Sequence, residues 1–156
     1  MPSSITSARL RPMPTKKVKH NLAFIGAGYV GLVSGTALAE IGHKVILVDN
    51  NKEKVASLKK GIVPIYEPGL DELVKKNVKA KKLAFTTNLK QAVKKSEVIF
   101  IAVNTPPQPN GTADLSYVAG AAREIAECAD SYKVVVDKST VPVKTGERVA
   151  ETIERY

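Results

Sequence analysis

Short runs of consecutive apolar residues alternate along the chain with longer segments in which apolar residues recur at helical spacing. The apolar runs predict five buried strands, at residues 21–25, 44–48, 83–85, 97–103 and 133–137. The segments between and after them predict six helices, one that follows Gly28 and others at residues 52–60, 70–77, 88–95, 115–128 and 144–156. Because strands that alternate with helices pair in parallel, this pattern predicts an α/β fold with a doubly wound parallel sheet.

The first predicted helix carries an apolar stripe, which we expect to pack against the strands. It is formed by Val30, Val33, Ala37, Leu38 and Ile41. Gly42 follows where a glycine commonly ends a helix. This segment therefore predicts a strand, a helix and a second strand in close succession.

The turn between the first strand and the first helix has the pattern G-x-G-x-x-G. Its residues are Gly26, Ala27, Gly28, Tyr29, Val30 and Gly31. In this pattern the first glycine allows a tight turn, the second lets the backbone approach a pyrophosphate, and the third lets the helix lie close to the strand. The helix then directs free N–H groups and the positive end of its dipole at the phosphates. The turn predicts a Rossmann-like unit in which these six residues bind a dinucleotide.

Asp49 ends the second predicted strand, 18 residues after Gly31, close to the spacing of about 20 that this motif shows. A carboxylate there accepts hydrogen bonds from the adenosine ribose and repels a 2′-phosphate. No arginine follows it, since the next residues are Asn50, Asn51 and Lys52. The sequence therefore predicts NAD rather than NADP as the cofactor. Two alternatives stay open: the unit binds nothing, or Asp49 merely caps the helix that begins near Asn51.

The loops after the fourth and fifth strands are rich in proline, serine and threonine. Open α/β sheets bind ligands at the edge where the carboxyl ends of their strands meet. We therefore expect one pocket to be lined from the glycine turn to these loops, with Val103, Asn104, Thr105, Pro106 and Pro107 along the cofactor backbone. Ser139 and Thr140 would place hydroxyls near the nicotinamide. The alternative is that both loops are ordinary turns, because these residue types are common in turns.

The distribution of charge along the chain argues against a nucleic-acid-binding protein. The net charge is +9, but five of the 24 basic residues and none of the 15 acidic ones lie in residues 1–20. We expect a disordered basic tail at 1–20 and one folded domain at 21–156. The lysines between 75 and 95 are not interleaved with aromatic residues, so we expect no nucleic-acid partner.

The remaining signals favour a cytoplasmic protein without a membrane partner. The longest apolar run, residues 98–103, has six residues, which is too short to span a bilayer. A single cysteine, Cys128, rules out an intrachain disulfide and fits a reducing compartment. Cys128 lies mid-helix, so we expect it to pack in the core. No spacing of histidine or cysteine predicts a metal site.

Four segments together resemble one family. They read GAGYVGL, IYEPGL, AVNTPP with ADLSYV after it, and KSTVPVKTGE. They are similar to the UDP-glucose/GDP-mannose dehydrogenase family, and most similar to its members that oxidise UDP-glucose. The resemblance covers about residues 21–156.

The resemblance implies an activity and a set of contacts. The activity is the oxidation of the UDP-glucose C6 alcohol to UDP-glucuronate with two NAD, through a covalent thiol ester. The implied NAD contacts are the glycine turn with Val30, then Asp49, Lys54, Thr105 and Thr140. Thr140 would also help to hold a water near the reacting centre, and is the one residue with an implied catalytic role.

The same resemblance implies that the domain is incomplete, because the chain stops before the sixth strand. The family's glutamate on that strand, the lysine on its central dimerisation helix and its nucleophilic cysteine have no counterpart here. We therefore expect the central helix and a C-terminal UDP-sugar domain to be absent, and the chain alone to be inactive. The sheet would expose an edge and an apolar face. The full-length protein would bind a UDP-sugar through the missing half and form a homodimer or a larger assembly.

Three other functions remain open, and one of them is nucleic-acid binding through the basic tail at residues 1–20, which would require a steeply salt-dependent affinity. The chain fits a dehydrogenase of GDP-mannose or of an N-acetylated UDP-sugar, because substrate choice lies mostly outside these residues. It also fits a stand-alone NAD-sensing module that performs no chemistry.

Overall fold

Five strands and six helices follow one another in the part of the chain that the computed structural model describes, residues 18–156. The strands are β1 (Asn21–Ile25), β2 (Lys44–Val48), β3 (Leu83–Thr86), β4 (Val98–Ile101) and β5 (Val134–Asp137). The helices are α1 (Tyr29–Glu40), α2 (Lys52–Lys59), α3 (Leu70–Lys79), α4 (Leu89–Lys95), α5 (Ser116–Cys128) and α6 (Thr145–Arg155). The predicted alternation is confirmed, and β4 is shorter than the strand predicted at 97–103.

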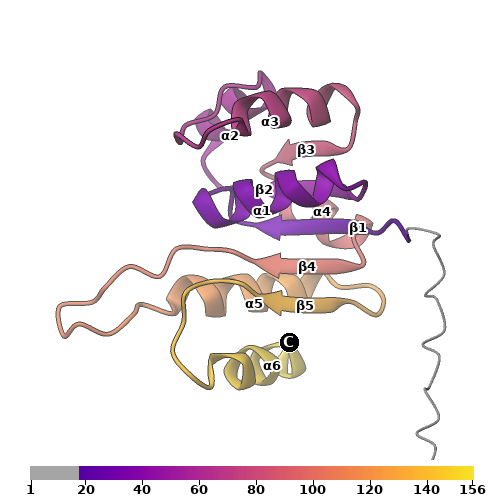
Figure 1. Cartoon of the computed structure of the whole chain (residues 1–156). Helices are drawn as coiled ribbons and strands as arrows, with labels where there is room; N and C mark the ends of the chain where they lie inside the picture. Colours follow the sequence, from indigo (N-terminus) through magenta and orange to yellow (C-terminus); the bar gives the residue numbers. More distant parts are fainter. Residues whose placement is uncertain (1–17) are drawn as a thin grey trace, which may run out of the picture.

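The five strands form one parallel sheet in the order β3-β2-β1-β4-β5 (Figure 1). The chain builds outward from β1 to β3, then crosses back to place β4 on the other side of β1. This confirms the doubly wound sheet. The loops that follow β1 and β4 leave the sheet in opposite directions, and such a reversal point is where open α/β sheets bind ligands.

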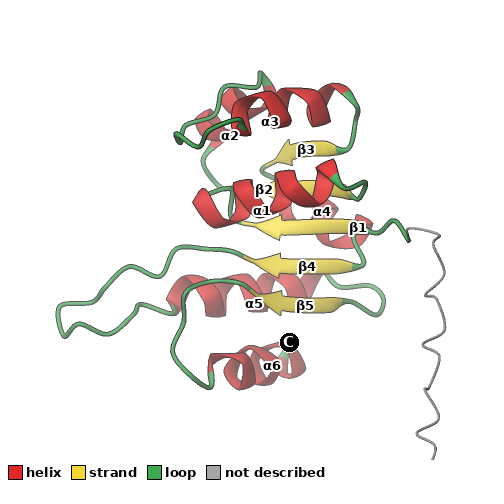
Figure 2. Cartoon of the chain, viewed as in Figure 1, coloured by secondary structure: helices red, strands yellow, loops and turns green. Residues whose placement is uncertain are grey.

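Helices cover both faces of the sheet, as Figure 2 shows with α1 in front of the sheet and α5 behind it. Leu22 and Phe24 of β1 belong to the core on the side of α1, α2 and α3. Ala23 and Ile25 point to the opposite core, which includes residues of α4, α5 and α6. Because β1 is buried on both faces, its sequence is a continuous apolar run rather than an alternating one.

The buried face of α1 differs from the predicted stripe. It consists of Gly31, Leu32, Gly35, Thr36 and Ala39. Of the predicted stripe, Val33 and Leu38 are partly buried against this core, whereas Val30 and Ile41 are 37% and 61% exposed. The reason is the close approach of the helix to the sheet. A Cβ atom at Gly35 would lie 3.1 Å from the Leu47 Cδ1 atom, so small residues, not large apolar ones, mark the contact.

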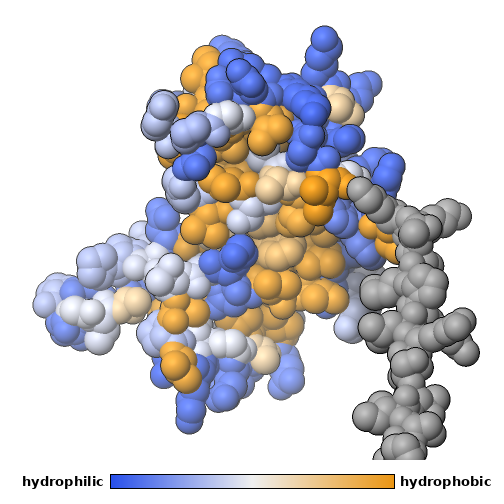
Figure 3. Space-filling model, in the orientation of Figure 1, coloured by the Kyte–Doolittle hydropathy of each residue, from blue (hydrophilic) through white to orange (hydrophobic). Residues whose placement is uncertain are grey.

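One part of the sheet is open on the α1 face. Val98 and Phe100 of β4 are half-buried there, and Val134 of β5 is 42% exposed. Figure 3 shows apolar surface on this side of the molecule. Among residues 18–156, β5 pairs only with β4, so the described sheet ends in an edge strand with an apolar face.

The amino-terminal segment joins the sheet at His20. Its N–H donates to His43 Nδ1 (3.2 Å), and its own Nδ1 lies 2.7 Å from Glu97 Oε2. Residues 1–17 of the tail predicted at 1–20 lie outside the described residues. Cys128 is partly buried and packs against the core behind the sheet, but it ends α5 and does not lie in mid-helix as predicted. No helix between residues 18 and 156 has the length and apolar character to cross a bilayer.

Candidate dinucleotide-binding site

The three glycines of the turn after β1 differ in how much space a side chain would have. Gly26 has φ +107°, and a Cβ atom there would lie 2.3 Å from the Ala102 carbonyl oxygen. A Cβ atom at Gly31 would lie 2.0 Å from the Gly26 carbonyl oxygen. At Gly28 the nearest atom is Asn104 Oδ1 at 3.7 Å, and φ is −78°. The fold therefore requires glycine at two positions, whereas Gly28 leaves open space in front of the backbone.

The helix that follows this turn begins without any anionic group of its own. Gly28 is the N-cap of α1, no side chain caps the helix, and its first turn holds no acidic residue. By contrast, α2 is capped by the Asn51 side chain and carries Glu53 in its first turn. The first N–H groups of a helix lack partners within the helix, and together with the helix dipole they favour a bound anion such as a phosphate.

The Asp49 carboxylate connects the glycine turn to α2. Its Oδ2 accepts hydrogen bonds from the Ala27 N–H (3.1 Å) and from Lys54 Nζ (2.7 Å). Its Oδ1 accepts from the Asn51 N–H (3.0 Å). Burial, which leaves Asp49 8% exposed, by itself raises the pKa. The hydrogen bonds from Lys54, Asn51 and Ala27 outweigh it and hold the Asp49 pKa below its usual value.

These contacts bear on the alternative that Asp49 only caps a helix. The Asn51 side chain caps α2 itself, because its Oδ1 accepts from the Lys54 N–H at 2.9 Å. Asp49 therefore holds the turn before the helix and is not the cap. An ionised carboxylate has about four acceptor positions, and the protein uses three of them. One remains for a ligand hydroxyl.

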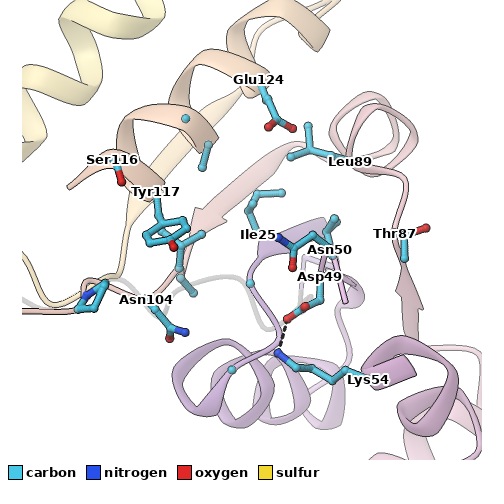
Figure 4. A pocket seen from close by; sticks show the side chains of 18 residues that line it. Ile25, Asp49, Asn50, Lys54, Thr87, Leu89, Asn104, Ser116, Tyr117 and Glu124 are labelled. Atoms are coloured by element: carbon cyan, nitrogen blue, oxygen red, sulfur yellow. Dashed lines mark hydrogen bonds and ion pairs between the residues drawn. The ribbon is translucent and has the colours of Figure 1, made fainter. Parts of the chain in front are cut away.

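A cleft of about 560 Å³ opens between the glycine turn, Asp49 and one face of α5 (Figure 4). This volume is in the range of small-molecule and cofactor sites. Its lining includes seven of the residues predicted from the sequence: Gly26, Gly28, Asp49, Lys54, Val103, Asn104 and Pro106. The structure therefore brings together the turn, the acid after β2 and the start of the loop after β4.

Four other predicted residues lie outside the lining of this cleft: Thr105, Pro107, Ser139 and Thr140. The Thr105 hydroxyl donates to the Thr140 carbonyl oxygen (2.8 Å), and the Ser139 hydroxyl donates to the Ile101 carbonyl oxygen (3.4 Å). Pro107 bridges to Ala113 within its own loop. The two loops lie side by side at the expected sheet edge, and their roles toward a nicotinamide stay predictions.

The other predicted residues of the glycine turn do not line the cleft. Ala27 is buried, Tyr29 is 54% exposed and Val30 is at the surface. The Tyr29 hydroxyl donates to Glu67 Oε2 (2.5 Å), and this hydrogen bond to a carboxylate raises the Tyr29 pKa. Glu67 belongs to the IYEPGL segment, so the contact ties the loop between α2 and α3 to the start of α1. Nothing local in the sequence indicates this pairing.

Part of the cleft was missed by sequence reasoning. The additional polar and apolar lining includes Asn50, Thr87, Leu89, Ser116, Tyr117, Gly120, Ala121 and Glu124. Four of these recur on α5 at i, i+3, i+4 and i+7, which is the spacing of one helix face. That spacing, with a glycine in mid-helix, is the signal that was available. No group of three or more potential metal ligands lies within residues 18–156.

The fold, the glycine turn and the cleft define a dinucleotide-binding domain of the Rossmann type. The chain belongs to the UDP-glucose/GDP-mannose dehydrogenase family, because the model of that family's NAD binding domain matches residues 20–156. This match confirms the resemblance found in the sequence and the assignment of NAD as the cofactor.

Individual relatives agree with the family. The chain is 52% identical over 134 residues to UDP-glucose 6-dehydrogenase TuaD of Bacillus subtilis (strain 168), covering 86% of this chain and 29% of the relative. It is 56% identical over 133 residues to UDP-glucose 6-dehydrogenase of Rhizobium meliloti (strain 1021), covering 85% and 30%. The solved UDP-glucose dehydrogenase of the archaeon Pyrobaculum islandicum superposes with a TM-score of 0.85 at 37% identity, covering 92% and 34%. The chain thus spans about a third or less of the length of these relatives.

Proposed function

We propose that this chain holds NAD in the cleft for a dehydrogenase that oxidises a nucleotide sugar, UDP-glucose. The observation that carries the cofactor site is the charged Asp49 carboxylate beside the open space at Gly28. When bound, NAD supplies a hydride acceptor. The residues of this chain bind it, orient it and keep its adenosine end in a fixed position.

We expect the parts of NAD to lie along the cleft in a fixed order. The pyrophosphate would lie at Gly28 and at the free N–H groups that begin α1. The adenosine ribose would lie at Asp49, whose remaining acceptor position suits a hydroxyl. Lys54 is bonded to Asp49, and this charge is therefore not available to a 2′-phosphate. The arrangement favours NAD over NADP.

The substrate side of the proposal rests on the relatives. Two relatives more than half identical to this chain are UDP-glucose 6-dehydrogenases. We propose the same twofold oxidation for the complete protein, with Thr140 near the reacting centre. A UDP-sugar would bind through residues outside this chain, in a cytoplasmic homodimer or larger assembly. The open apolar face of β4 and β5 offers a surface for such contacts.

By itself, we expect this chain to bind NAD without oxidising UDP-glucose. The two-step oxidation requires a reactive thiolate, and Cys128 is packed against the core on α5, away from the lining of the cleft. Incubation of the chain with NAD and UDP-glucose should therefore yield no NADH. NADH formation at a steady rate would contradict this part of the proposal.

Calorimetric titration of the chain with NAD and with NADP tests the cofactor site. NAD should bind at least about tenfold more tightly, because a 2′-phosphate would lie beside the Asp49 carboxylate, and the adjacent Lys54 ammonium is already paired with that carboxylate. Equal affinities would contradict the assignment of Asp49. Absence of NAD binding would overturn the proposal as a whole.

A further inference from the structure

One face of α5 forms a wall of the cleft. Tyr117, Gly120, Ala121 and Glu124 line it, at the spacing of a single helical stripe. The neighbouring stripe, with Val118, Ala122 and Ile125, is buried in the core behind the sheet. Helix α5 is therefore held in place by its buried face, and its other face is accessible to a ligand in the cleft.

Gly120 makes this wall flat. A glycine inside a helix lowers stability relative to alanine. Packing does not require it here, since a Cβ atom at Gly120 would have no atom within 4 Å. Gly120 and Ala121 leave a shallow apolar surface, and Leu89 at the start of α4 lines the same end of the cleft. A slot between two apolar surfaces suits a planar aromatic ring.

Glu124 stands at the end of this slot beside Leu89, with Asp49 and Lys54 across the cleft (Figure 4). Among the residues that the structure describes, its carboxylate makes no hydrogen bond or ion pair. The adjacent cation, Arg123, is bonded to Glu127 instead (2.8 Å). An ionised carboxylate only accepts hydrogen bonds, so the exposed Glu124 side chain offers an acceptor at this end of the slot.

We infer that Glu124 accepts a hydrogen bond from the exocyclic amino group of the adenine of bound NAD, and thereby selects adenine over 6-oxopurines. This inference rests on the proposed function, which places the adenosine ribose at Asp49. The base then extends from the ribose away from the pyrophosphate, toward Leu89 and Glu124. Adenine carries an N6 amino donor at the edge where guanine carries the O6 acceptor. On the N7 side of the base, where a 6-oxopurine presents only the acceptors N7 and O6, a carboxylate therefore attracts the amino group of adenine and repels the oxo group.

A pair of dinucleotides that differ at this one position tests the inference. NAD and nicotinamide hypoxanthine dinucleotide, in which a 6-oxo group replaces the amino group, are titrated against the chain. We expect NAD to bind about tenfold more tightly, the effect of one hydrogen bond to a charged group. In Glu124→Gln this ratio should fall to within about twofold, because an amide both donates and accepts.

Glu127→Gln is the matched control, since it makes the same chemical change on the same helix outside the cleft. It should leave the affinity ratio as in the unchanged chain. A ratio that is the same in the unchanged chain and in Glu124→Gln overturns the inference and leaves NAD binding intact. Failure of the unchanged chain to bind NAD overturns the proposed function, and the inference with it.

Gly120→Leu tests the slot independently. The change should maintain or raise the melting temperature, because leucine is a better helix former than glycine and the space in front of Gly120 is open. It should lower the affinity for both dinucleotides by at least about tenfold, since the side chain fills the position of the base. Unchanged affinity would show that the base does not lie against α5.

Discussion

The two sides of the proposed cofactor site are built in contrasting ways. On the adenosine side, the buried Asp49 carboxylate accepts three hydrogen bonds, one from Ala27 of the glycine turn and two from the segment that begins α2. On the other side, the loops after β4 and β5 are largely exposed, and their hydroxyls bond to backbone carbonyls. The first side is organised before any ligand arrives. The second is held by a few surface contacts.

This difference indicates which part of the site this chain completes by itself. The adenosine side has fixed backbone, a charged acceptor and space for a phosphate. The loops lie beside the cleft without lining most of it. We therefore expect binding energy from the adenosine end and little from the nicotinamide end.

Gly31→Ala should have the largest effect, because its Cβ atom would lie 2.0 Å from the Gly26 carbonyl oxygen. The backbone of the turn must then move, and we expect a loss of about 3 kcal/mol or more in the free energy of unfolding. Urea denaturation measures it. Gly146→Ala is the control, since nothing lies within 4 Å of a Cβ atom there. Similar stability of the two variants would show that the turn is not tightly fixed.

Asp49→Asn should weaken NAD binding by about 10- to 100-fold, because a hydrogen bond to a charged acceptor is lost. Lys54 also loses its charged partner. NAD titrations of both proteins measure the effect. An affinity within about twofold of the unchanged chain would place the ribose away from Asp49.

The same carboxylate predicts a dependence of stability on pH. Its pKa is lower in the folded chain than the usual value near 3.9. Its ionised form therefore stabilises the fold fully above that usual value, and the contribution is lost as the pH falls through the folded pKa. The stability difference between the unchanged chain and Asp49→Asn should be constant from about pH 5 to 7 and shrink below about pH 4. A difference that grows on acidification would contradict the pKa direction.

Lys144→Gly should have the smallest effect, and in the stabilising direction. Lys144 has φ +71°, a conformation that costs a residue with a Cβ atom about 1–2 kcal/mol. Glycine relieves this strain but loses more chain entropy on folding. We therefore expect the free energy of unfolding, measured by thermal denaturation, to rise by about 0.5 kcal/mol. Lys138→Gly, at a position without positive φ, should instead be destabilising. A loss of stability in both variants would show that Lys144 makes a compensating contact.

The contrast between the two sides also explains what could be predicted from the sequence. Strands buried on both faces produce unbroken apolar runs, and a glycine turn followed by Asp49 is a local pattern, so both were predicted. The contact face of α1 was predicted only in part: Val33 and Leu38 pack against the core, but its centre is formed by Gly31 and Gly35, which pack more closely than large apolar residues allow. The pairing of Tyr29 with Glu67 is set by a loop far along the chain, and local spacing does not encode it.

The Gly28→Ala variant tests the central claim most directly. Gly28 has backbone angles that alanine adopts, and the nearest atom to an added Cβ is 3.7 Å away. The variant should melt within about 2 °C of the unchanged chain, yet lose NAD affinity by at least about tenfold, because the methyl group occupies the place of the pyrophosphate. Calorimetric titration of both proteins with NAD is the measurement. Equal affinity of the two folded proteins would contradict the proposed site.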